Sequence, residues 1–149
     1  MDLMIQHGTY LIPTMMVHVY FGQPTNDNIV LTKAVEIAKR TNQQVYQNIK
    51  LAFKKGVKFG MGTDDLGWPA EYSAKEFEEY LKIGMTPMQA ILCATKVNAE
   101  ILRKEKEIGS VEAGKLADII AVKGDPLKDI SELQRVKFVM IGGKIIKNE

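Results

Sequence analysis

The clearest pattern of apolar and polar positions lies in residues 56–65, GVKFGMGTDD. Side chains of a strand alternate between two faces, and here the bulky residues share one face: Val57, Phe59 and Met61. The opposite face carries Gly60, Gly62 and then Asp64. We expect the bulky face to pack on helices and the glycine face to leave room for a group that approaches the backbone closely. Asp64 would stand at the carboxyl end of the strand, where parallel α/β folds place their chemistry.

Two further segments precede this strand. Residues 10–19 are almost continuously apolar, which is typical of a strand covered on both faces, although Pro13 better suits a strand end or a sheet edge. Residues 29–55 have apolar side chains at helical spacing, and Gly56 follows them where a helix commonly ends. The pattern therefore predicts a strand, a long helix and then the central strand.

Helical patterns follow the central strand. Two capping boxes are expected: Ser73 with Glu76, and Thr86 with Gln89. They predict one helix over residues 73–83 and another over 87–103, the second apolar on nearly all sides and therefore buried. Cys93 lies within this second helix, where we expect an inert core thiol.

From residue 108 onward the pattern changes to strands. Residues 116–122 form an apolar run between turn residues, and residues 136–141 and 144–147 flank Gly142-Gly143, a pair suited to a two-residue hairpin turn. The order of elements predicts an α/β fold with a small β unit appended. We place the boundary between an α/β part, residues 1–107, and a β part, residues 108–149.

Composition narrows the class of protein. The chain has 149 residues, 46% hydrophobic and 26% charged, which fits one globular domain. Its net charge of +2 argues against a nucleic-acid or anionic-membrane partner. No run approaches the roughly 20 apolar residues of a membrane span, and no signal peptide is recognised. With one cysteine, an internal disulfide is excluded and a reducing, cytoplasmic location is expected.

The best chemical candidates are Asp64 and Asp65, because a carboxylate at a strand end can bind a divalent metal and exchange a proton with its bound water. The spacing alone favours a plain turn with Asx-type hydrogen bonds. A catalytic metal typically needs three protein ligands, and the two histidines, His7 and His18, form no ligand motif. We expect His7 to end a helix and His18 to be a satisfied or solvent-facing residue.

Several stretches resemble the C-terminal part of the metal-dependent amidohydrolases. They are residues 57–64 (VKFGMGTD), 84–91 (GMTPMQAI) with Asn98-Ala99, 108–120 (IGSVEAGKLADII), 124–127 (GDPL) and 139–144 (VMIGGK). Within that superfamily the chain is most similar to the imidazolonepropionase-like and Xaa-Pro dipeptidase, or prolidase-like, branch. The resemblance covers nearly the whole chain in the same motif order.

This resemblance implies a (β/α)8 TIM-type barrel with a small β domain. A whole barrel takes about 250 residues, so the chain would hold only the last barrel strands, their helices and C-terminal strands of the small domain. The family's aspartate after the eighth strand binds the metal, most often zinc, and carries the proton of the hydrolytic water. That role falls on Asp64. The family's histidine and lysine ligands have no counterparts here, and Asp65 stands where relatives often have a small residue.

The implied reaction is hydrolysis of an amide or related C–N bond in a small molecule or dipeptide. We expect the isolated chain to have no catalytic activity. Two interpretations of the chain are possible. It is a portion of an enzyme whose missing N-terminal half supplies the histidines, or it is a non-catalytic structural or interaction domain derived from that fold. Because a half barrel exposes strand edges, we expect that half, or a second copy in a homo-oligomer, to cover them.

Overall fold

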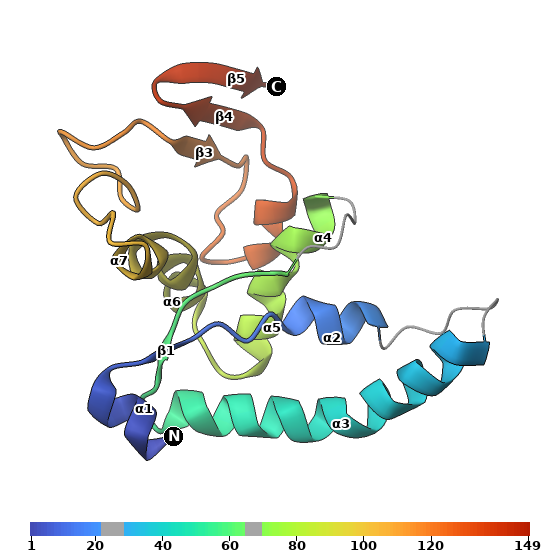
Figure 1. Ribbon diagram of the computed structural model, residues 1–149. Helices are drawn as coiled ribbons and strands as arrows, with labels where there is room; N and C mark the ends of the chain where they lie inside the picture. The colour runs from blue at the N-terminus through green and yellow to red at the C-terminus, as the bar shows by residue number, and fades with distance from the viewer. Residues whose placement is uncertain (22–28, 65–69) are drawn as a thin grey trace.

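The structure is a computed structural model that describes the backbone of residues 1–21, 29–64 and 70–149; the side chains at 18, 20, 21, 29–41, 70 and 71 are also outside the description. The amino-terminal part contains five elements: α1 (Asp2–His7), β1 (Tyr10–Leu11), α2 (Met15–Phe21), α3 (Ile29–Lys54) and β2 (Lys58–Phe59). Strands β1 and β2 are parallel, with Tyr10 opposite Lys58 and Leu11 opposite Phe59. The long helix α3 runs along one side of the molecule (Figure 1).

The predicted strand over residues 10–19 is wrong beyond Leu11, because the apolar run turns into helix α2 at Met15. Pro13 has no N–H to donate to a sheet, and Thr14 has a φ of +45°, which breaks the extended conformation. A continuous apolar run fits a buried strand and a buried helix equally well. The long helix was predicted correctly, since α3 ends at Lys54 and Gly56 follows with a φ of +86°.

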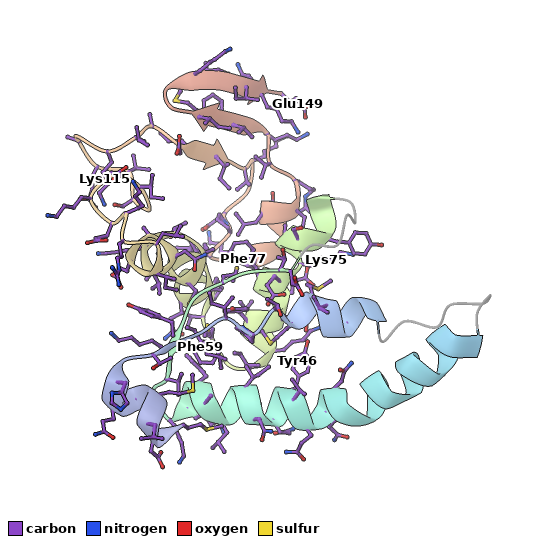
Figure 2. All side chains as sticks on the ribbon, in the orientation of Figure 1. Tyr46, Phe59, Lys75, Phe77, Lys115 and Glu149 are labelled. Carbon is purple, nitrogen blue, oxygen red and sulfur yellow. The ribbon has the colours of Figure 1, made fainter. Side chains whose placement is uncertain are left out.

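The bulky face of the central strand packs into the core, as predicted. Val57, Phe59 and Met61 are 5%, 5% and 9% exposed. The ring of Phe59 meets those of Phe53 and Tyr80 edge to face, with centroids 6.0 and 6.3 Å apart. Figure 2 shows Phe59 between the strands and α3. The core therefore lies where this strand meets α3 and the following helices.

Helices and one π-helical turn follow the central strand: α4 (Ala70–Ala74), α5 (Glu76–Lys82), α6 (Pro87–Leu92), the π-helix η1 (Cys93–Val97) and α7 (Asn98–Ile101). The predicted capping box of Thr86 and Gln89 is present, with the Gln89 N–H donating to Thr86 Oγ1 at 3.2 Å and the Thr86 N–H to Gln89 Oε1 at 2.9 Å. The predicted box of Ser73 and Glu76 is wrong. Glu76 is the first residue of α5, and its carboxylate bonds to α2 instead.

The C-terminal part is a small antiparallel sheet in the order β3-β4-β5. It contains β3 (Ile119–Ala121), the 3₁₀-helix η2 (Ile130–Gln134), β4 (Phe138–Ile141) and β5 (Lys144–Asn148). The predicted hairpin is confirmed, because Gly142 and Gly143 take φ values of +54° and +80° between β4 and β5. Asp118 Oδ1 accepts a 2.6 Å hydrogen bond from the Gly142 N–H. This sheet and α3 lie at opposite ends of the molecule (Figure 1).

Candidate active site

The candidate site is the edge at which the two parallel strands end. Since β1 and β2 are parallel, the segment after β1, residues 12–14, and the segment after β2, residues 60–64, leave the sheet on the same side. Asp64 is exposed there. Thr14 and Asp64 have φ values of +45° and +51°, which are uncommon for residues other than glycine and most unusual for a β-branched one. Such backbone strain persists only where the surroundings hold it.

The glycine face of the central strand is approached closely, as expected, and the approaching groups belong to the chain itself. A Cβ at Gly60 would lie 2.4 Å from Ile101 Cδ1 and 2.8 Å from Asn98 Oδ1, and one at Gly62 would lie 3.0 Å from Ile12 Cγ2. The close approach that these glycines permit is therefore made by side chains of β1's exit segment and of α7. Beyond Gly62, the exposed Asp64 follows.

Asn98 supplies the hydrogen bonds that a neighbouring strand would otherwise make. Its Oδ1 accepts from the Met61 N–H at 3.0 Å, and its Nδ2 donates to the Met61 carbonyl at 2.7 Å. The π-helical turn η1 directly precedes Asn98, and such turns are frequent at functional sites. Sequence reasoning missed this role, because Asn98 stood out only as part of a resembling motif.

Helix α5 makes hydrogen bonds to the segments that follow both strands. The Tyr80 hydroxyl donates to the Gly60 carbonyl at 2.5 Å, and the Glu76 carboxylate accepts from the amides of Met15 and Met16 at 2.8 and 2.7 Å. Burial raises the pKa of Glu76 to about 7, against the two backbone hydrogen bonds, which lower it, and with a smaller rise from nearby Glu79. The sequence pattern pointed only to a local cap for Glu76.

Glu79 anchors the other side of α5. Its carboxylate accepts a hydrogen bond from the Tyr46 hydroxyl of α3 and pairs with Lys82 Nζ at 2.7 Å. Figure 2 shows Tyr46 projecting from α3 toward α5. Burial, the hydrogen bond to Glu79 and its charge raise the pKa of Tyr46. Two nearly buried carboxylates of α5 thus face different elements, α2 and α3.

The described residues do not complete a metal site. Within them, no group of three or more His, Cys, Asp or Glu side chains could hold a metal ion. His7 ends α1 as predicted, ahead of β1 and away from the strand ends, and it is exposed. Asp65 and the His18 side chain lie outside the described residues. A catalytic metal beside Asp64 would therefore need further ligands than the described residues bring together.

Cys93 is buried, as predicted, and burial raises the pKa of its thiol to about 11. A thiol with a raised pKa holds its proton at neutral pH and is a poor ligand and nucleophile. Asp118 and Asp125 each bond to a backbone N–H, of Gly142 and Leu127 respectively. Of Asp64, Cys93, Asp118 and Asp125, Asp64 is the residue that follows the shared end of β1 and β2.

A parallel strand pair with flanking helices, a carboxylate at the strand ends and a small antiparallel sheet define a portion of an α/β barrel with its β appendage. The sequence model of the amidohydrolase family matches residues 1–146. The chain belongs to this family. The predicted fold class, the C-terminal portion of a TIM-type barrel plus strands of a small β domain, is thereby confirmed.

Comparisons with solved structures and with curated relatives are consistent with this family. A Xaa-Pro dipeptidase with methionine bound in its active site is 37% identical, with a TM-score of 0.88, over 99% of this chain and 36% of that one. Ochratoxinase of Aspergillus niger is 30% identical over 98% of this chain and 31% of its own length. A 5-methylthioadenosine/S-adenosylhomocysteine deaminase of Thermoanaerobacter pseudethanolicus is 27% identical over 93% and 38%. The chain thus spans less than two fifths of these relatives.

Within residues 1–21, 29–64 and 70–149, no helix is both long and apolar enough to cross a membrane.

Proposed function

We propose that this chain forms the late-barrel portion of a hydrolase that cleaves a C–N bond, and that Asp64 is its catalytic contribution. The observation that carries the proposal is the position of Asp64. Its exposed carboxylate follows β2 at the shared end of two parallel strands, in a chain of the amidohydrolase family. In barrel enzymes the active site lies at this end of the strands.

Asp64 would act as one metal ligand and as a proton carrier. A divalent metal, with zinc as the first candidate, would lower the pKa of its bound water to about 7 when held by a complete ligand set. The carboxylate of Asp64 would take a proton from the hydrolytic water and return it to the leaving nitrogen. The strained backbone at Asp64, with its φ of +51°, would fix the direction of that carboxylate.

The remaining ligands would come from polypeptide outside these 149 residues, either an N-terminal barrel half or a second copy of the chain. Two observations support this. The described residues contain no ligand cluster. Among them β1 and β2 also pair only with each other, so each keeps a free edge, and free edges favour association with another strand.

A dipeptide is the proposed substrate class, because the similar Xaa-Pro dipeptidase shares 37% identity and a TM-score of 0.88 with this chain. The test is to express the chain alone and together with a histidine-bearing N-terminal barrel half. Metal content, oligomeric mass and hydrolysis of Xaa-Pro dipeptides are measured on both preparations. Asp64→Asn is the diagnostic variant. Asp125→Asn is its matched control, because Asp125 is an exposed aspartate that bonds only near its own turn.

We expect the isolated chain to be silent, and the complex to hold one or two metal equivalents and to hydrolyse the dipeptide. Asp64→Asn should lower kcat by about 100-fold or more, the usual contribution of a positioned acid and base, while Asp125→Asn should leave it unchanged. Metal-dependent peptidase activity of the chain alone would contradict the expected silence. Absence of metal in both preparations would reduce Asp64 to a turn residue and favour a structural or interaction domain.

A further inference from the structure

Glu76 makes a long-range contact that local sequence rules do not predict. Its carboxylate, 0% exposed, accepts hydrogen bonds from the Met15 N–H at 2.8 Å and the Met16 N–H at 2.7 Å. These two amides open helix α2, which directly follows the exit of β1. Burying a carboxylate is unfavourable unless it is well bonded, so a contact of this kind in the core requires an explanation.

The backbone of the β1 exit explains why a distant carboxylate caps α2. Threonine is a good N-cap residue, but an N-cap normally has extended backbone angles. Thr14, immediately before α2, has a φ of +45°. Pro13 has no N–H. Thr14 thus does not have the backbone angles of a usual N-cap, and the first two amides of α2 donate to Glu76, 60 positions beyond Met16.

The same exit segment packs on the strand that carries Asp64. A Cβ at Gly62 would lie 3.0 Å from Ile12 Cγ2 and 3.9 Å from Thr14 Cγ2, so these two side chains rest on the backbone two residues before Asp64. Tyr80, one helical turn after Glu76, binds the Gly60 carbonyl at 2.5 Å. Helix α5 therefore holds both strand ends, one through a carboxylate and one through a hydroxyl.

We propose that Glu76 is a positioning residue: by clamping the Met15 and Met16 amides, it holds the 12–14 segment against Gly62 and so fixes the direction in which Asp64 leaves β2. The carboxylate suits this task because its two oxygens accept from two donors at once. That Asp64 then acts in catalysis rests on the proposed function. The positioning itself is a property of this chain and is measured separately.

The decisive variant is Glu76→Gln, which keeps the shape but replaces one acceptor oxygen with an NH₂ donor. Its matched control is Glu79→Gln, since Glu79 is also nearly buried in α5, at 3% exposed, but bonds to Tyr46 of α3. We expect Glu76→Gln to raise amide hydrogen exchange at Met15 and Met16 by at least about tenfold, as for a lost buried hydrogen bond. It should also move the NMR signals of Gly62 to Asp64.

Glu79→Gln should leave both groups of signals in place. Two results would overturn the proposal. If Glu76→Gln loosens Met15 and Met16 without moving residues 62–64, Glu76 is a helix cap only. If both variants disturb residues 62–64 equally, the effect is a general loosening of the core.

The unmodified chain gives a second test that needs no variant. Among the described side chains, the titratable groups facing Glu76 are Glu79 and Tyr80 of its own helix and Tyr46 of α3. The described α2 side chains at 15, 16, 17 and 19 are uncharged. Because the pKa of Glu76 is raised to about 7, the amide signals of Met15, Met16 and residues 62–64 should titrate together near that pH. Titration at Met15 and Met16 alone would contradict the coupling.

Activity adds a separate readout in the complex of the chain with its N-terminal half. There, Glu76→Gln should lower kcat more than it changes KM, because the substrate pocket remains while Asp64 is misdirected. If coupled NMR shifts are seen but the complex neither binds metal nor hydrolyses dipeptides, the positioning stands and the proposed function fails. If the complex is active but Glu76→Gln does not shift the NMR signals of residues 62–64, the proposed function stands and the positioning role of Glu76 fails.

Discussion

At the scale of single residues, Asn98 and Gly60 depend on each other to hold the central strand. The amide of Asn98 fits both backbone groups of Met61 because its oxygen accepts and its nitrogen donates. The amide reaches the strand only because Gly60 has no side chain, since a Cβ there would lie 2.8 Å from Asn98 Oδ1. The glycine that suggested room for a closely approaching group thus makes room for the amide of Asn98.

We therefore predict that Asn98→Ala destabilises the chain by about 2–3 kcal/mol, because it leaves a donor and an acceptor of Met61 unpaired. Asn48→Ala is the control, since Asn48 is exposed on α3 and should change stability by at most about 0.5 kcal/mol. Urea denaturation followed by circular dichroism measures both. Equal stability of the two variants would show that water satisfies Met61 once the amide is gone.

At the scale of elements, the helix that starts at Pro87 illustrates what local sequence rules predict well. Thr86 and Gln89 bond reciprocally within one turn, so nothing distant is needed to form this cap. We predict that Thr86→Ala lowers the free energy of unfolding by about 1 kcal/mol. Thr86→Ser, which keeps the hydroxyl, should lose much less. A thermal or urea melt distinguishes them, and equal losses would mean that the cap does not depend on the hydroxyl.

Local rules fail where a distant partner decides. The long helix, the buried face of the central strand and the glycine hairpin were all predictable, since each follows from its own residues. The end of β1 was not predictable, because an apolar run does not reveal that Glu76 will bind the amides of Met15 and Met16. The apparent capping box of Ser73 and Glu76 failed for the same reason.

The candidate site was predictable to the same extent. Asp64 could be selected from sequence because it follows an alternating strand with glycines on its own face. Its surroundings could not be predicted, since they come from helices further along the chain. Glu76, Tyr80 and Asn98, which reach the strand ends, lie 12 to 34 positions after Asp64. Residues that approach through folding leave no local pattern.

At the scale of the whole molecule, the cost of burying Glu76 should appear as pH-dependent stability. The ordinary pKa of Glu76, 4.5, applies to the unfolded chain, and the folded chain raises it to about 7. Between these values the folded state binds the extra proton, so its stability is greatest at the acidic end and falls as the pH rises toward 7. The interval corresponds to at most about 3 kcal/mol.

We predict that the free energy of unfolding decreases from pH 5 to pH 8 in the unmodified chain, and that this decrease is largely absent in Glu76→Gln, which has no proton to release. Glu105→Gln, a change at an exposed glutamate, should retain it. Carboxylates with a lowered pKa, those of Glu112, Asp129 and Glu149, titrate below this range and do not mask the effect. Urea denaturation at several pH values measures the slope. An unchanged slope in Glu76→Gln would place the titrating group elsewhere. If the slope disappears and the Met15 and Met16 amides also exchange faster, the buried Glu76 carboxylate lowers stability near neutral pH while it holds the strand end beside Asp64.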